Sequence, residues 1–205
     1  MWYNGLVVET RVSELPLVLA AGFIEHWHYS GCVPTGKNIF FGWFVPGDQT
    51  LLGESLYAVA DYGIGVNPYQ AQYLARCTGY EVAEGNLVEL KRLCRSEPRL
   101  DRFPLTAFLA RCHRLLRASG YRYVVSYSDP FHGHSGGIYK AANFQHLGAT
   151  NAEWHVQDAD GVIRHRRYAY RYARRNGVST VEARQALGLK RVQMPPKDRW
   201  FLRIG

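Results

Sequence analysis

The chain alternates between short apolar runs and polar breaks that contain glycine or proline, a pattern that indicates a mixture of strands and helices. Residues 38–45 and 51–60 are strongly apolar and aromatic. Between them, the Pro46-Gly47-Asp48 segment supplies residues that favour a tight turn. We therefore predict that the two runs form a central antiparallel pair of a sheet.

Apolar residues recur at the 3.6-residue spacing of an amphipathic helix between residues 105 and 116. Pro104 stands where a first helical residue belongs, and Gly120 is a typical helix stop. The same reasoning places other elements along the chain. Strands are expected at residues 6–9, 86–93, 121–127, 150–157, 162–172 and 200–204, and helices at residues 14–27 (capped by Ser13), 69–76 and 180–187.

The segment 123–148 combines a buried strand with polar residues. Ser126 and Asp129 stand at the carboxyl end of the strand, where open α/β sheets usually build their sites. Of Ser126 and Ser128, we expect at most one to point into the site. A loop with two histidines and three glycines follows, and then one or two helical turns at residues 138–144, with Gly148 as their C-cap.

Length and composition favour one domain with a sizeable core, because 205 residues with 47% hydrophobic and 20% charged side chains fit a globular chain. No apolar run reaches the ~18 residues that a membrane span needs. The N-terminus does not have the pattern of a signal peptide, so we expect a cytoplasmic protein without a membrane partner. The four cysteines show no C-x-x-C spacing, and we expect them to be free and buried.

The net charge of +8 is concentrated late in the chain. From residue 164 onward, basic residues far outnumber the two acidic ones, Glu182 and Asp198, which indicates a phosphate-binding surface. A solvated basic face is the alternative. We predict that residues 162–205 form a basic late strand and C-terminal extension of a single domain, 1–205, and that this segment contacts DNA through arginines interleaved with tyrosines. The arginines are Arg164, Arg166, Arg167, Arg171, Arg174 and Arg175.

Three sequence blocks carry a resemblance to a known family. They are His28-Tyr29-Ser30-Gly31 with the aromatic run that follows, Glu89-Leu90-Lys91-Arg92-Leu93, and the segment from Ser126 to Phe144 with its SYSDP, GH, GIY and NF motifs. With these blocks, the sequence resembles the phage Mom family of DNA-modification proteins. The order of predicted elements resembles the GNAT-like acyltransferase fold, so the expected fold class is α+β with a mixed sheet.

The resemblance implies a phage enzyme in the host cytoplasm that adds a carbamoylmethyl group to the exocyclic amine of adenine in double-stranded DNA. This modification would hide restriction sites from host enzymes. Because the amine is inside the helix, the base must be flipped into a pocket, where aromatic faces can hold it. Trp27, Tyr29, Phe40, Phe41 and Trp43 are candidates, although aromatic residues in a strand more often belong to the core.

Proton transfer needs an acceptor for the amine proton and a donor for the leaving group. We predict that Asp129 is the acceptor, with an Asx-type turn before Pro130 as the structural alternative. Tyr139 matches the position of a tyrosine general acid in GNAT enzymes, and its alternative is packing against the sheet. His28, Tyr29 and Ser126 complete the expected catalytic set.

The expected donor site departs from the GNAT pattern, since the loop before the long helix contains no glycine to cradle a pyrophosphate. Arg92, Arg95, Arg99 and Arg102 are the candidate phosphate or carboxylate ligands. The donor is therefore expected to be acetyl-CoA, by superfamily resemblance, or an aminoacyl-tRNA-like molecule.

Two H-x-H pairs leave a metal site open. His26 and His28 form one pair, and His132 and His134 form the other, so iron or zinc is conceivable, but neither pair is a specific motif.

Two other functions compete with the Mom-like interpretation. One is a GNAT-like acyltransferase acting on a small amine or a protein, and the other is a non-catalytic nucleic-acid-binding module.

Overall fold

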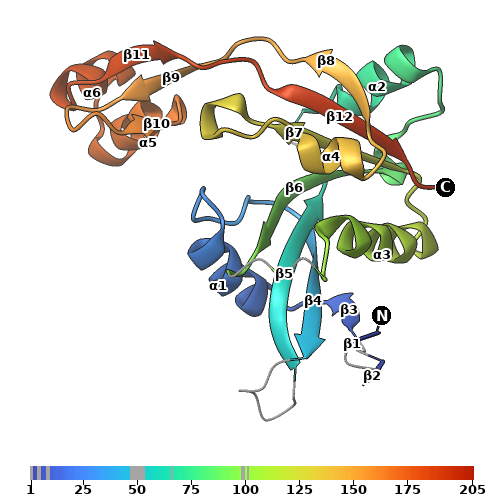
Figure 1. The fold of residues 1–205 in the computed structure, drawn as a ribbon. Coiled ribbons are helices and arrows are strands. Elements are labelled where there is room, and N and C mark those ends of the chain that lie inside the picture. The colour runs from blue at the N-terminus through green and yellow to red at the C-terminus, as the bar shows by residue number, and fades with distance from the viewer. Residues whose placement is uncertain are drawn as a thin grey trace. The chain divides into compact units, whose positions relative to one another are not determined.

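The computed structural model describes residues 2–3, 6–7, 10–46, 54–65, 67–97, 100 and 102–205. The chain divides into two compact units. The first contains residues 1–128, 136–148 and 199–205, and the second contains residues 129–135 and 149–198. Figure 1 shows the course of the chain through both.

The first unit is built on a seven-stranded sheet with the order β3-β4-β5-β6-β7-β12-β8. Strands β3 to β6 pair in antiparallel fashion, whereas β6 and β7 are parallel, so the sheet is mixed. A short antiparallel pair, β1 (Trp2–Tyr3) and β2 (Leu6–Val7), precedes it. The strands are β3 (Arg11–Glu14), β4 (Asn38–Pro46), β5 (Glu54–Gly63), β6 (Leu87–Arg95), β7 (Tyr123–Ser128), β8 (Gln145–Ala149) and β12 (Asp198–Arg203).

Helices cover both faces of this sheet (Figure 1). The helices are α1 (Leu17–Trp27), α2 (Gln70–Thr78), α3 (Leu105–Ala118) and α4 (Gly137–Ala141). Alternation along β4 puts Phe41 and Trp43 in the core cluster that α3 covers, and Phe40 in the cluster that α1 covers. The predicted amphipathic helix and central strand pair are therefore confirmed, and these three aromatic residues belong to the core.

The parallel pairing of β6 and β7 runs from Leu87–Tyr123 to Leu90–Ser126. Both strands continue beyond that point, β6 to Arg95 and β7 to Ser128. Beyond Leu90 and Ser126 the two strands no longer pair with each other, although β6 stays paired with β5 as far as Arg95. This is the position where the sequence places its polar residues.

The second unit contains a three-stranded sheet with the order β10-β9-β11 and two helices. Its elements are η2 (Pro130–His132), β9 (Trp154–Gln157), β10 (Ile163–Arg164), α5 (Arg167–Asn176), α6 (Thr180–Ala186) and β11 (Lys190–Gln193). Its buried residues are few and mostly small, with Ala169 and Ala173 from α5 and Ala183 from α6. Val156 and Met194 add the larger buried side chains.

Four predictions differ from the structure. The helix at residues 14–27 begins only at Leu17, because Ser13 pairs with Gly42 in β3 and Pro16 stands at the N-cap. The strand at residues 162–172 ends at Arg164, and α5 replaces the rest. Gly148 does not cap a helix but lies in β8, which the sequence analysis did not predict. The expected burial of all cysteines holds for Cys94 and Cys112, whereas Cys32 and Cys77 are exposed free thiols.

The other predicted elements are confirmed to within a few residues, including β6, β7, β12, α2 and α6. Of the first predicted strand, Leu6 and Val7 form β2, and Val8 and Glu9 lie outside the described residues. The predicted turn at residues 46–48 and the start of the second run at 51–53 also lie outside them, apart from Pro46. No helix in the described ranges is long and apolar enough to cross a membrane.

Candidate active site

The centre of the candidate site is a hydrogen-bonded pair of hydroxyl groups, Ser126 on β7 and Tyr139 on α4, 2.8 Å apart. The Ser126 hydroxyl also lies 2.8 Å from the Leu90 carbonyl oxygen, at the last paired position of β6 and β7. A carbonyl can only accept, and a serine hydroxyl has one hydrogen. Ser126 therefore donates to Leu90, and the Tyr139 hydroxyl donates to Ser126.

The Tyr139 hydroxyl is held as a neutral phenol. Burial raises its pKa, the hydrogen bond with Ser126 lowers it, and the nearby Tyr29 and Glu89 raise it further. The lowering by Ser126 has a simple cause, since a rotated Ser126 hydroxyl can donate to the phenolate. Tyr139 thus keeps its proton at neutral pH but has a partner ready for the charge that proton loss would create.

Trp200 on β12 fixes the position of the Tyr139 ring. The two rings stack with centroids 5.8 Å apart, and the Trp200 indole nitrogen donates to the Ser128 hydroxyl at 2.9 Å. Gly136, at the N-cap of α4, has a φ of 75°, and a Cβ at this position would clash with the Trp200 ring. The loop therefore needs glycine for both backbone conformation and space.

Ser126 and Ser128 both serve this arrangement, one through Tyr139 and the other through Trp200. The expectation that at most one of them points into the site is wrong. Residues two positions apart on a strand project from the same face, so the two hydroxyls reach the same stacked pair of rings.

The loop after α1 carries His28 and Tyr29, whose rings lie 4.3 Å apart. The Ser30 backbone N–H donates to His28 Nδ1 at 3.1 Å, so Nδ1 is the acceptor nitrogen and Nε2 carries the proton of the neutral ring. Tyr29 is 51% exposed, and Trp27 is 37% exposed. Of the five candidate stacking aromatics, these two are the ones accessible to a base.

Asp61 on β5 is a buried carboxyl group next to this region. Its side chain is fully buried, and neither oxygen has a hydrogen-bond partner among the described residues. Burial raises its pKa to about 7, Lys91 and Arg92 lower it, and Glu89 raises it. Asp61 faces Arg92 in the register of β5 and β6. An unpartnered buried acid of this kind marks a candidate functional position.

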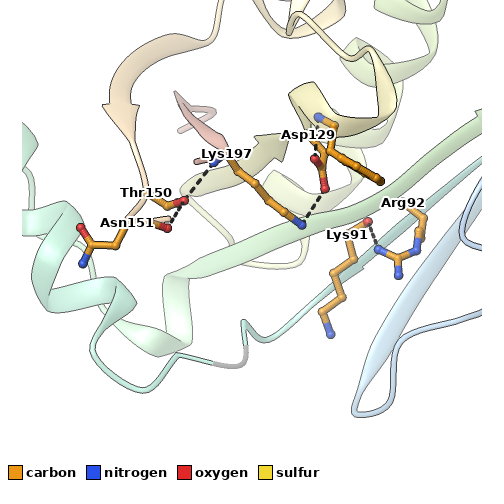
Figure 2. A network of polar contacts seen from close by, with 7 residues as sticks. Lys91, Arg92, Asp129, Thr150, Asn151 and Lys197 are labelled. Atoms are coloured by element: carbon orange, nitrogen blue, oxygen red, sulfur yellow. Dashed lines mark hydrogen bonds and ion pairs between the residues drawn. The ribbon is translucent and has the colours of Figure 1, made fainter. Parts of the chain in front are cut away.

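Asp129 begins the second unit directly after β7. Its Oδ1 accepts the Phe131 backbone N–H at 3.1 Å, the Asx-type turn weighed from the sequence, and its Oδ2 lies 2.9 Å from the Lys197 ammonium. The Lys197 backbone N–H donates to the Thr150 hydroxyl at 3.0 Å, which anchors the start of the lysine side chain (Figure 2). Asp129 is thus fixed on both oxygens.

The candidate donor-binding arginines are placed separately. Arg92 donates to the carbonyls of Cys32 and Lys91 at 3.4 and 2.7 Å, and the second of these contacts is drawn in Figure 2. Arg95 forms an ion pair with Glu97 at 3.2 Å. The Arg102 guanidinium lies over the Phe103 ring at 5.0 Å. Arg99 lies outside the described residues.

The candidate DNA-binding arginines lie in the second unit, and most of them are on a helix rather than a strand. Arg167, Arg171, Arg174 and Arg175 are exposed on α5, where they line a shallow hollow with Tyr170. Arg166 is exposed at the N-cap of α5. Arg164 is bound to Asp158 at 2.6 Å, a contact that lowers the pKa of this carboxyl.

The histidine pairs were candidate metal ligands. Among the described residues, no group of three or more His, Cys, Asp or Glu side chains is arranged to hold a metal ion. His132 and His134 are exposed in the second unit. His26 and His28 lie at the end of α1 in the first unit.

The family assignment comes from a model of the Mom protein family, which matches residues 9–200. The chain belongs to the Mom protein family. The match runs from β3 into the first half of β12 and includes the Ser126–Tyr139 pair, Asp61 and Asp129. Curated proteins give no match to this sequence.

Solved acetyltransferase structures share the fold of this Mom family member. NAA60 of Arabidopsis thaliana in complex with acetyl-CoA superimposes with a TM-score of 0.56 at 11% identity, over 96% of this chain and 99% of that one. A putative acetyltransferase from Acinetobacter baylyi gives 0.50 at 11% identity, over 97% and 94%. The predicted GNAT-like fold is confirmed.

Sequence reasoning missed Asp61 and Trp200 as site residues in this Mom family protein. The predicted strand ended at Ala60, one residue before Asp61, whereas β5 continues to Gly63. A lone acid inside an apolar strand was the available signal. Trp200 had no such signal, because its contact with Tyr139 depends on β12 returning beside β7 in the sheet.

Proposed function

We propose that this protein is a transferase that places a carbamoylmethyl group on the exocyclic amine of adenine in double-stranded DNA. The observation that carries this proposal is the Mom family match over residues 9–200. The GNAT-like fold and the Ser126–Tyr139 pair support a group-transfer reaction at the carboxyl end of β7. In this proposal, the modification protects phage DNA from restriction inside the host cell.

The proposed reaction is a displacement at the carbon of the donor that carries the carbamoyl group. The amine nitrogen of adenine forms a bond to this carbon, and the bond between the carbon and the leaving group breaks. One amine proton must leave the nitrogen, and the leaving group must gain a proton or an equivalent stabilising contact. The protein therefore needs one proton acceptor and one proton donor.

Tyr139 is proposed as the proton donor. Burial keeps its hydroxyl protonated, and Ser126 can turn its own hydrogen toward the phenolate as the proton leaves. The stacked Trp200 ring holds the phenol in place during this transfer. Tyr139 thus combines a retained proton with a prepared stabilising group, which is what general acid catalysis requires.

Asp129 is proposed as the acceptor of the amine proton. The Phe131 N–H and the Lys197 ammonium fix the orientation of its carboxyl group. Each carboxylate oxygen can accept more than one hydrogen bond, so these two contacts leave acceptor capacity for an amine. His28, whose Nε2 carries the proton, is proposed as a hydrogen-bond donor to the base, and the exposed Tyr29 as a stacking surface.

The donor is proposed to be held by arginines, since the loop before α3 contains no glycine. Arg92, Arg95 and Arg102 offer guanidinium groups for a phosphate or a carboxylate. Acetyl-CoA and an aminoacyl-tRNA-like molecule both bring phosphate groups that these arginines could bind. The displacement also requires a leaving group on the carbon that carries the carbamoyl group, and acetyl-CoA lacks both that leaving group and the carbamoyl group. The α5 arginines are proposed to neutralise phosphates of the target duplex.

The test is expression of the protein with a plasmid in a host that lacks the modification, followed by mass spectrometry of the plasmid nucleosides. The wild-type protein should yield an adenosine with one carbamoylmethyl group. Tyr139→Phe should reduce its yield at least ~100-fold, as expected for loss of a general acid. Asp129→Asn should act similarly, whereas Asp160→Asn, which changes an exposed acid, should not.

Three outcomes would contradict different parts of the proposal. Absence of any modified nucleoside with a soluble wild-type protein would contradict DNA modification. A modified small amine or protein in the same cells would instead favour the acyltransferase alternative. Retention of full activity by Tyr139→Phe would exclude the assigned proton donor but leave the substrate proposal intact.

A further inference from the structure

Helices α5 and α6 form two consecutive helices joined by a short, fixed turn. The turn consists of Gly177, Val178 and Ser179. Gly177 has a φ of 65°, and its N–H donates to the Ala173 carbonyl. The Val178 N–H donates to the same carbonyl at 3.1 Å. The first helix therefore ends in a left-handed glycine cap, and glycine is frequent in the turn of helix–turn–helix motifs.

The second helix begins with a capping box. The Ser179 hydroxyl accepts the Glu182 N–H at 3.2 Å, and the Glu182 carboxylate accepts the Ser179 N–H at 2.7 Å. These reciprocal contacts fix the direction in which α6 leaves the turn. Both ends of the turn are thus specified by side chains or backbone contacts of its own residues.

The two helices pack on alanines. Ala173 and Ala183 are buried, and α5 and α6 contact each other. Ala173 lies four residues before the glycine of the turn. Small side chains let the helix axes approach closely. Most of the surface of both helices therefore remains exposed to solvent. A helix pair held this way leaves nearly a whole face of α6 free to enter a groove.

The sheet of the second unit supports α6 from behind. Arg184, on α6, lies over the Trp154 ring of β9 at 5.4 Å, and Arg191, on β11, lies over the same ring at 4.8 Å. Arg184 is therefore engaged in holding the helix to the sheet. The residues left on the outer face are Val181, which is 61% exposed, and Gln185, which is also exposed.

Val181 and Gln185 are four residues apart on a helix, so they are neighbours on one face. Their chemistry suits the edges of base pairs. Glutamine can bond to adenine N6 and N7 in the major groove, and an aliphatic side chain can contact the thymine methyl group. Val181 is 61% exposed and Gln185 is also exposed, so both side chains are accessible to a base pair.

The α5 helix provides the charge. Arg167, Arg171 and Arg175 recur every fourth residue, with Arg174 beside them, and α5 contains no acidic residue. They form one exposed basic stripe on the helix that precedes α6. In helix–turn–helix proteins, the first helix crosses the phosphate backbone while the second lies in the major groove.

We propose that α5 and α6 form a helix–turn–helix element that reads double-stranded DNA. In this element, α6 lies in the major groove with Val181 and Gln185 on base edges, and the α5 arginines contact phosphates. The element selects the sequence in which the enzyme acts. This inference rests on the proposed function, since it takes the DNA substrate as given and adds the means of choosing its sequence.

The test uses the full-length protein and a pool of short DNA duplexes with a randomised centre. Bound duplexes are sequenced, and affinities for the selected duplex and a scrambled one are measured by fluorescence anisotropy. The wild-type protein should select a consensus. Gln185→Ala and Val181→Ala should each lose preference at one or two base pairs, with roughly 5- to 100-fold weaker binding of the selected duplex and unchanged binding of the scrambled one.

A second set of variants, in the α5 arginines, separates phosphate contacts from base recognition. Arg171→Gln with Arg175→Gln should weaken binding to both duplexes alike and reduce the slope of log affinity against log salt by about 2. Arg114→Gln with Arg117→Gln, which removes the same charge from exposed positions on α3, should change neither. Circular dichroism of each variant verifies that α5 and α6 remain folded.

An unchanged consensus in both α6 variants would overturn the inference, and so would tighter binding of single-stranded RNA than of the selected duplex. Sequencing the modified sites in a plasmid separates a failure of this inference from a failure of the proposed function. Adenine modification whose context is unaffected by the α6 variants would overturn the helix–turn–helix inference alone. Sequence-selective binding that depends on α6, without any modified nucleoside, would overturn the proposed function alone.

Discussion

The buried Asp61 carboxyl should make the stability of the protein fall as the pH rises through neutrality. Its pKa is raised from 3.8 to about 7, chiefly by burial, and neither oxygen has a hydrogen-bond partner in the described part of the chain. Between these values the folded state holds a proton that the unfolded state has lost. The stabilisation is therefore complete below about pH 4 and lost as the pH passes 7.

Asp61→Asn removes this titration while keeping the shape of the side chain. Each tenfold change in proton affinity corresponds to about 1.4 kcal/mol, so the full effect has an upper limit of about 4 kcal/mol. Between pH 5 and pH 8 the wild-type protein should lose about 2.5 kcal/mol relative to the variant. The variant should therefore gain relative stability at alkaline pH, whatever its cost at pH 5.

The assay is urea unfolding of both proteins from pH 5 to pH 8, followed by circular dichroism and tryptophan fluorescence. Comparison of the two proteins cancels the opposite effect of His113, whose buried ring has a pKa lowered to about 4 and stabilises the fold as the pH rises toward 6.5. Asp160→Asn, at an exposed position, serves as the control and should track the wild type. A difference between Asp61→Asn and wild type that does not vary with pH would refute the reasoning.

Three further predictions concern the site. Gly136→Ala should destabilise the protein by about 2 kcal/mol or more in thermal unfolding, because the new Cβ would clash with Trp200 and the left-handed backbone would be strained. Gly133→Ala, at a φ of 74° in open space, should cost about 1 kcal/mol from backbone strain alone. Equal losses of stability in the two variants would contradict this. Ser126→Ala should lower the modification rate and raise the pKa of Tyr139, measured by ultraviolet titration; an unchanged pKa would count against the pair. Lys197→Met should impair activity and also lower stability, because it removes the ion-pair partner of the Asp129 carboxylate, whose side chain is only 10% exposed; unaltered activity would separate Lys197 from Asp129.

Much of the first unit could be predicted from the sequence, because its strands and helices carry strong local signals. The aromatic run of β4 and the 3.6-residue period of α3 each point to one structure. Ser126 and Tyr139 were also predictable, since a polar residue at a strand end and a short helix after glycines indicate a site. Their mutual hydrogen bond was not, because it depends on the loop between them.

The second unit was harder to predict, and α5 shows why. Its tyrosines recur at every second position, at Tyr168, Tyr170 and Tyr172, which favours a strand, while its only buried residues are Ala169 and Ala173. Alanines at a four-residue spacing give a weak hydrophobic signal although they are strong helix formers. Asp61 was missed for a related reason, since a prediction based on apolar runs places the end of the strand after Ala60, where the uninterrupted apolar run 56–60 stops.

The proposed DNA modification is most directly tested by the mass of the adenine nucleosides in plasmid DNA that was replicated in cells producing this protein. We expect an adenosine heavier by one carbamoylmethyl group in place of a hydrogen, present with the wild-type protein and strongly reduced with Tyr139→Phe. Plasmid DNA whose adenosine is unmodified, in cells where the folded wild-type protein is abundant, would contradict it.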